Sequence, residues 1–156
     1  MRRRLGTVVA VAALMASAGC GSQMSPPSVG EPDSPGPGPV HGARVLPLIS
    51  MTGGGGRVSL RASPLNSDAQ MQRFASQFRA PALAGRVTDA AANAATSGYP
   101  VYGAVVAIGC DRPPGADVSL DADGRVLITP REVVSPLPEC LAAVTTVAIA
   151  TVPGAD

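Results

Sequence analysis

The sequence predicts a small α+β or β-sandwich-like domain, mostly of strands, with one or two helices and a single disulfide staple. Three observations support this fold class. Runs of β-branched residues dominate the second half of the chain, one amphipathic helical stripe precedes them, and two cysteines each adjoin a predicted strand. The length of 156 residues is that of one domain.

We expect three consecutive parts. Residues 1–19 form an N-terminal leader, residues 20–43 form a linking segment that begins at Cys20, and residues 44–156 form a single folded domain. The folded part is long enough for one modest hydrophobic core.

The N-terminus has the order of features found in a secretory signal peptide. Arg2, Arg3 and Arg4 are basic, the stretch 5–15 is apolar, and small residues then lead to Cys20. The apolar stretch is shorter than the roughly 20 residues that span a bilayer. We therefore interpret it as a leader that is removed.

The residues Ser17-Ala18-Gly19-Cys20 resemble the lipobox of bacterial lipoproteins, although the family usually has an aliphatic residue where Ser17 stands. The resemblance covers about the first twenty residues, and the overall layout is similar to that of small actinobacterial lipoproteins. It implies cleavage before Cys20 and a diacylglycerol on that thiol, which would hold the chain on the extracytoplasmic face of the cell membrane. An ordinary secretory cleavage after Ala18 is the alternative.

The segment that follows Cys20 has the composition of a tether. Pro, Gly and Ser occupy fifteen of the twenty-two positions from Gly21 to Gly42. Such a segment has too little apolar surface to offset the entropy of ordering, so we expect disorder with some polyproline character.

The folded part is predicted to begin with two strands. Residues 44–49 form the first, and Pro47 makes it an edge strand. Gly53–Gly56 is expected to be a flexible turn, and residues 57–61 alternate like a half-buried strand.

One helix is well marked. Ser67 is a good N-cap, with Gln70 three residues later to complete a capping box, and Pro81 is expected to end the helix. A second, alanine-rich helix is expected from Thr88 to Ser97, closed by Gly98. The first helix carries an apolar stripe that we assign to the core rather than to a partner: Met71, Phe74, Ala75 and Phe78.

The remaining elements are strands. Residues 101–108 form an apolar run suited to a central strand that is covered on both faces. Residues 117–120 and 125–129 flank the turn signal Asp121–Gly124 and predict a hairpin. A long β-branched strand from 142 to 152 closes the domain.

The number of cysteines predicts one disulfide. If Cys20 is acylated, Cys110 and Cys140 remain as an even pair, as an exported protein prefers. A disulfide between them would contribute about 3.6 kcal/mol in the chain-entropy model. A redox or metal-binding pair would favour C-x-x-C spacing, and Glu139 beside Cys140 gives no electropositive setting for a thiolate.

No catalytic constellation is visible. The single histidine, His41, lies in the tether, which disfavours serine–histidine and cysteine–histidine catalysis and most zinc sites. Gly53–Gly56 is not followed by the lysine of a phosphate-binding loop. Asp121-x-Asp123-Gly124 matches only a fragment of a calcium loop, so we interpret it as a turn. We expect no catalytic residue, metal site or cofactor.

Charge and anchor together define the expected function. Without the leader, nine arginines and no lysine face eleven acids, which gives no basic footprint for nucleic acid. We expect a lipoprotein of the cell envelope, anchored through diacylglycerol on Cys20, acting as a non-enzymatic binding or structural module with a possible envelope protein partner. The alternatives are a small extracytoplasmic hydrolase or enzyme accessory, and a carrier of an apolar ligand.

Overall fold

The computed structural model describes residues 38–154, which contain two helices and eight strands. In chain order the elements are β1 (Gly38–Pro39), β2 (Arg44–Val45), β3 (Ile49–Thr52), β4 (Ser63–Pro64), α1 (Asp68–Ala75), α2 (Pro81–Ala95), β5 (Val101–Gly109), β6 (Ala116–Leu120), β7 (Val126–Pro130) and β8 (Val144–Thr151).

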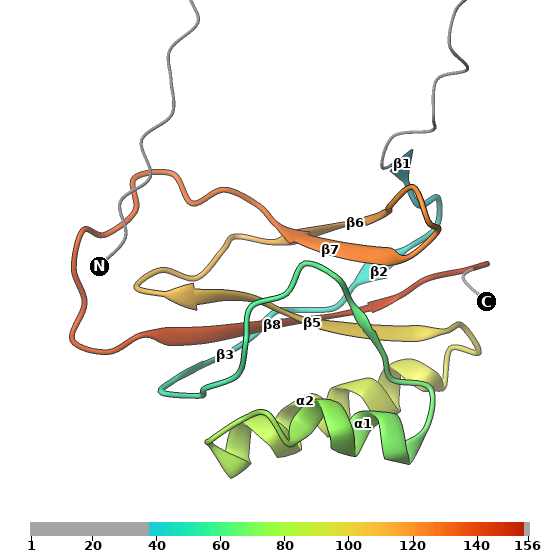
Figure 1. Ribbon diagram of the computed structural model, residues 1–156, viewed down its shortest axis with the longest axis horizontal. Helices are drawn as coiled ribbons and strands as arrows, with labels where there is room; N and C mark the ends of the chain where they lie inside the picture. Colours follow the sequence, from blue (N-terminus) through green and yellow to red (C-terminus); the bar gives the residue numbers. More distant parts are fainter. Residues whose placement is uncertain (1–37, 155–156) are drawn as a thin grey trace, which may run out of the picture. The chain divides into compact units, whose positions relative to one another are not determined.

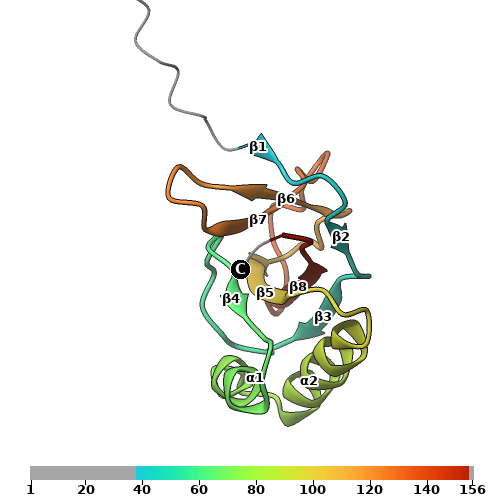
Figure 2. The ribbon, with the colours of Figure 1, turned by 90° about the vertical axis from the view of Figure 1, so that its right-hand side faces the viewer.

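Two long antiparallel strands, β5 and β8, form the centre of a five-stranded sheet (Figure 1). β2 and β3 pair with the other edge of β8, and β4 pairs with β5. β1, β6 and β7 form a separate antiparallel sheet. Figure 2 shows this smaller sheet on one side of β5 and β8 and both helices on the other side. The predicted fold class, a mostly-β α+β domain with helices on it, is confirmed.

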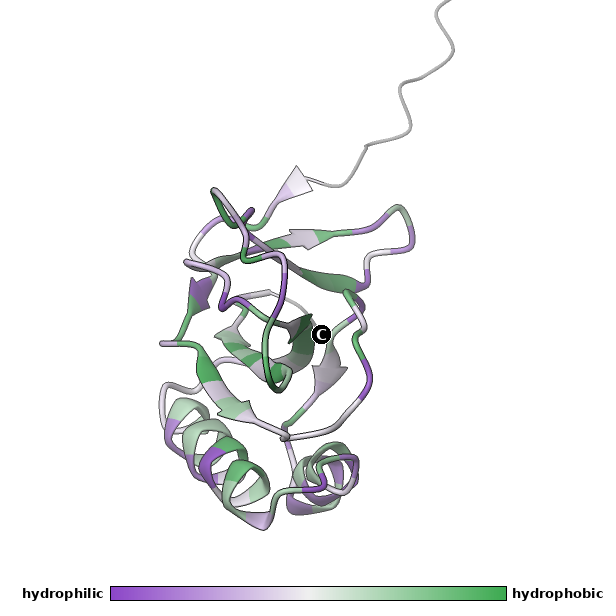
Figure 3. Cartoon of the chain, turned by 90° about the vertical axis from the view of Figure 1, so that its left-hand side faces the viewer, coloured by the Kyte–Doolittle hydropathy of each residue, from purple (hydrophilic) through white to green (hydrophobic). Residues whose placement is uncertain are grey.

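The central strands are buried on both faces. In β8, Val147 and Ile149 pack into the core beneath the helices, whereas Ala148 and Ala150 pack into a second core beneath β6 and β7. Alternate residues of a strand point to opposite faces, so one strand serves both cores. In Figure 3 the central strands are mostly hydrophobic, and hydrophilic segments gather on the helices and peripheral loops. The predicted two-sided burial of the run that forms β5 is confirmed.

α1 begins as predicted but ends earlier. Ser67 is the N-cap, and its hydroxyl accepts a hydrogen bond from the backbone N–H of Gln70 at 3.4 Å. The Gln70 amide oxygen accepts from the N–H of Asn66 at 2.8 Å, one residue before the position that a standard capping box would use. Phe78 lies beyond the helix but stays buried, in edge-to-face contact with Phe74 at 5.6 Å between ring centroids.

The predicted start of the second helix is wrong by seven residues. α2 begins at Pro81, where proline fits because the first helical N–H needs no intrahelical acceptor. Thr88, expected near the start, lies inside the helix, and its hydroxyl donates to the carbonyl of Ala84 at 3.0 Å. The helix ends at Ala95, close to the predicted end, and Gly98 has a positive φ of 77°.

The two strands predicted before α1 are altered. Pro47, which has no N–H, separates β2 from β3, so the first predicted strand is two short ones. Residues 57–61 form no strand, because their hydrogen bonds go to both sheets. The N–H of Ser59 donates to Val105 in β5, whereas Arg61 bridges Leu127 in β7. The segment therefore crosses from one sheet to the other.

The glycine run 53–56 is packed rather than flexible, which corrects the sequence-based expectation. The carbonyl of Gly54 accepts from the N–H of Arg79 at 2.8 Å, and the carbonyl of Gly55 accepts from the hydroxyl of Thr145 at 2.9 Å. A Cβ at position 54 would lie 2.5 Å from Cδ2 of Leu83 and 3.0 Å from Cβ of Thr145. Glycine is needed here for close approach to α2 and β8.

Replacing Gly54 by alanine is therefore expected to lower the free energy of unfolding by about 1–3 kcal/mol, the usual cost of overpacking. The measurement is denaturant unfolding of the full chain. Gly85→Ala is the matched control, because a Cβ there meets nothing within 4 Å and alanine favours the helix by up to about 1 kcal/mol. Equal stability of the two variants would contradict the steric argument.

The predicted disulfide and hairpin are both present. Cys110 and Cys140 are bonded, with their Cα atoms 5.3 Å apart. β6 and β7 pair from Ala116↔Pro130 to Leu120↔Val126 around the predicted turn.

Part of the segment assigned to the tether pairs with the domain. Gly38 lies opposite Leu120, and Pro39 lies opposite Ser119. Within residues 38–154, neither helix has the length and apolar character needed to cross a bilayer.

Candidate functional site

Of the site residues expected from the sequence, the structure describes the two disulfide cysteines but not the expected lipidation site. Cys110 and Cys140 form the disulfide between the end of β5 and the start of β8. Cys20, the expected lipidation site, lies outside the described residues. His41 is exposed in the turn between β1 and β2.

The acids around the β6–β7 hairpin are engaged in the fold. Oδ1 of Asp121 accepts from the N–H groups of Asp123 and Arg125, both at 2.9 Å, and Arg125 forms ion pairs with both aspartates. Asp117 pairs with Arg131 at 2.7 Å. Hydrogen bonds from Arg131 lower the pKa of Asp117, and those from Arg125 lower the pKa of Asp121.

These contacts favour the turn interpretation over an ion site. Among residues 38–154, no group of three or more acidic, histidine or cysteine side chains is arranged to hold a metal. General-acid catalysis favours a carboxyl group with a raised pKa, whereas the pKa values of Asp117 and Asp121 are lowered.

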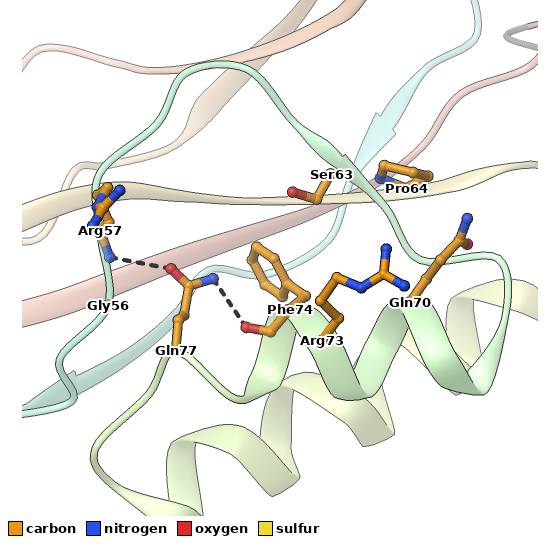
Figure 4. Close-up of a pocket in the computed structure, with 8 residues that line it drawn as sticks. All are labelled: Gly56, Arg57, Ser63, Pro64, Gln70, Arg73, Phe74 and Gln77. Carbon is orange, nitrogen blue, oxygen red and sulfur yellow. Dashed lines mark hydrogen bonds between the residues drawn. The ribbon is translucent and has the colours of Figure 1, made fainter.

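A groove of about 630 Å³ runs along α1, between the helix and the segment that leads into β4 (Figure 4). Its volume lies within the range of small-ligand sites. We call it the α1 groove. It is lined by Gly56, Arg57, Ser63, Pro64, Gln70, Arg73, Phe74 and Gln77.

One wall of the α1 groove is a single face of α1 and of the residues directly after it. Gln70, Phe74 and Gln77 recur at i, i+4 and i+7 and so share one face of the helical segment and its continuation. Figure 4 shows the Phe74 ring between Arg73 and Gln77, with Arg73 rising toward the strand that carries Ser63. Phe74 is only 7% exposed, so it supplies a floor rather than an open apolar surface.

Hydrogen bonds hold the two walls together. The amide oxygen of Gln77 accepts from the backbone N–H of Arg57 at 3.1 Å, and its NH₂ donates to the carbonyl of Phe74 at 3.0 Å. The amide oxygen of Gln70 is similarly fixed by Asn66, which leaves the NH₂ of Gln70 as an available donor. These glutamines give the groove a defined shape.

The electrostatic character of the α1 groove is positive. Arg57 extends from one wall and Arg73 from the other, and no acidic side chain is among the lining residues. Within residues 38–154, neither guanidinium makes an ion pair or hydrogen bond. The same holds for Arg44, Arg61, Arg79 and Arg112, so what sets Arg57 and Arg73 apart is that they line one groove together. The groove therefore presents two unneutralised cations and neutral donors to solvent.

A second groove, of about 720 Å³, lies between the β1–β3 region and β6. The side chains of its lining are mostly apolar, with residues such as Val40, Leu46 and Pro114, although polar atoms make up about half of the exposed lining. Its charged members, Asp117 and Arg131, neutralise each other. It offers shape but little charge with which to select a ligand.

Sequence reasoning missed the α1 groove. Arg57 and Arg73 are sixteen positions apart, one in an irregular segment and the other on a helix. No short motif relates them. The one hint in the sequence was that Arg73 adjoins Phe74, a residue of the apolar stripe. The opposite wall could not be predicted, because it depends on the path of residues 56–64 in the folded chain.

Comparisons with protein-family models, with curated proteins and with solved structures found no significant match to this chain.

Proposed function

We propose that this protein is a lipid-anchored binding module of the bacterial cell envelope, held on the extracytoplasmic face through Cys20 and binding its ligand in the α1 groove. The observation that carries the binding role is the pair Arg57 and Arg73 on opposite walls of that groove, with no acidic side chain in its lining. Two unpaired cations in one groove favour a ligand that carries negative charge.

The anchoring part of the proposal depends on the leader and on Cys20. The Cys110–Cys140 bond supports it, because stable structural disulfides are typical of oxidising, extracytoplasmic compartments. Seventeen residues, 21–37, lie between the lipid-bearing position and β1, and a polyproline chain of that length would reach about 50 Å at ~3.1 Å per residue. That reach would let the groove meet ligands away from the membrane.

The geometry ranks the rival functions lower. A carrier of an apolar ligand needs an enclosed apolar cavity, whereas both grooves are open to solvent and the Phe74 floor of the α1 groove is nearly covered. A hydrolase would need a nucleophile beside a base, and Ser63 is the only hydroxyl in the lining, without an acid or histidine in the same groove. Binding is the function that uses the residues present.

Replacing Cys20 by alanine tests the anchor. The variant is expected to lose the diacylglycerol and to appear in the medium or accumulate unprocessed, because the acyl acceptor is gone. Cell fractionation and intact-mass measurement provide the readout. Ser22→Ala, two residues away, is the matched control and should be processed and retained like the parent chain. A Cys20 variant that is cleaved to the mature mass and still stays in the membrane would contradict lipidation.

A further inference from the structure

We infer that the α1 groove binds a linear polyanion, a sugar or polyol chain that carries phosphate or carboxylate groups, with one anionic group held by Arg57 and another by Arg73. This inference rests on the proposed function, because it takes the α1 groove as the ligand site. It goes further by naming the chemical class of the ligand and the two residues that select it.

The charge of Arg57 and Arg73 complements an anionic ligand. Guanidinium groups bind phosphate and carboxylate through paired N–H donors, and they remain charged at all physiological pH values. Arg125 and Arg131 use their N–H donors to bind aspartates of the β6–β7 hairpin. Arg57 and Arg73 both line the α1 groove and form no such pair within residues 38–154. Two cations on facing walls favour a ligand with more than one negative group.

Neutral hydrogen-bond donors also line the α1 groove. The NH₂ of Gln70 and the hydroxyl of Ser63 lie in the lining beside the two cations. Fixed amide and hydroxyl donors suit the hydroxyl and ether oxygens that separate the charges of a sugar or polyol chain. The lining adds no carboxylate that would repel such a ligand.

The shape of the α1 groove and the edge of the sheet beside it favour a soluble sugar or polyol chain over other polyanions. The Phe74 floor lies between two walls, so a flat bilayer surface cannot reach it, whereas a single chain can lie along the groove. An acidic polypeptide would gain most by adding a strand to the sheet edge at β4. Pro64 occupies half of that two-residue strand and has no N–H to donate. Recognition through side chains therefore favours the glycan or polyol chain.

The experiment measures binding to the full chain, expressed with its own leader and purified from whichever cell fraction contains it. The probes are fluorescent poly(glycerol phosphate) and polygalacturonate, which carry the phosphate and carboxylate forms of the same chemistry. Arg57→Gln and Arg73→Gln are each expected to weaken binding about fivefold, and the double variant more than about twentyfold, as for exposed charge pairs in one site. Arg112→Gln, an exposed arginine outside the groove, should change the affinity less than twofold.

Three results would overturn the inference. An equal loss of affinity in Arg112→Gln would mean that the probe senses net charge only. Stronger binding to vesicles that contain anionic phospholipid would indicate a membrane headgroup, and equal binding of poly-glutamate would indicate an acidic polypeptide. Unchanged thermal unfolding of the groove variants excludes loss of fold as the cause. The Cys20→Ala chain tests the anchor separately: if it is cleaved to the mature mass, stays in the membrane and binds the polymer, only the anchoring proposal fails.

Discussion

Removing the bond between Cys110 and Cys140, by replacing both residues with alanine, is expected to lower the free energy of unfolding by about 3.6 kcal/mol. The two cysteines are 30 positions apart, and their bond closes the segment that contains β6 and β7. The native pairing of β5 with β8 already extends to Gly109↔Val144, next to the bond. The effect should therefore arise mainly in the unfolded chain, which regains the freedom of an open loop.

Guanidinium unfolding of the full chain, with and without reductant, measures this effect. The parent chain after reduction should match the double alanine variant, because both lack the same cross-link. The variant Cys20→Ala, which keeps the bond, is the control and should unfold like the parent under oxidising conditions. A loss of less than about 1 kcal/mol would show that the reduced unfolded state stays compact.

Replacing Leu83 by alanine is expected to lower the free energy of unfolding by about 3 kcal/mol, within the range for buried leucines. Leu83 is fully buried in the core beneath α2, where it contacts the site of Gly54. The loss combines the transfer of apolar surface with the cavity that remains. Leu141→Ala is the matched control, because Leu141 is fully exposed and should change stability by less than about 0.5 kcal/mol.

The same pair of positions allows a coupling test. In the Leu83→Ala background, Gly54→Ala should cost less than it does in the parent chain, because the methyl group nearest to the added Cβ is absent. Denaturant unfolding of the four chains gives the coupling energy. Additive effects would show that Thr145, rather than Leu83, sets the cost at position 54.

Much of the fold could be predicted where local chemistry and tertiary packing agree. The turn Asp121–Gly124 marked the hairpin because its aspartate accepts the N–H groups of its own turn, and no distant partner is needed. The cap at Ser67 is equally local. The run that forms β5 predicted burial on both faces because it contains no polar alternation.

Elements that depend on distant partners were predicted less well. Residues 57–61 have the alternation of a strand, but alternation does not say which strand lies alongside, and here the partner changes from β5 to β7. Pro81 was taken as the end of a helix, although proline is equally suited to begin one. The glycine run 53–56 was taken as flexible because the close approach of Leu83 is not visible in one dimension.

The candidate site was predictable only in part. The disulfide followed from cysteine arithmetic, because only one pairing remained once Cys20 was assigned to lipid. The α1 groove did not follow, because its charge comes from Arg57 and Arg73 on separate elements and its shape from hydrogen bonds through Gln77. The groove could be detected only from the path that residues 56–64 take in the folded chain.

The unequal side chains on the two faces of β8 also protect the alignment of the sheet. Val147 and Ile149 point toward the helices, and Ala148 and Ala150 point toward the hairpin. Slipping this strand by one residue would invert every side chain, forcing bulky groups under the hairpin and leaving voids under the helices. Both mismatches would arise at once, so a misaligned β8 would lose close packing on both faces of the sheet.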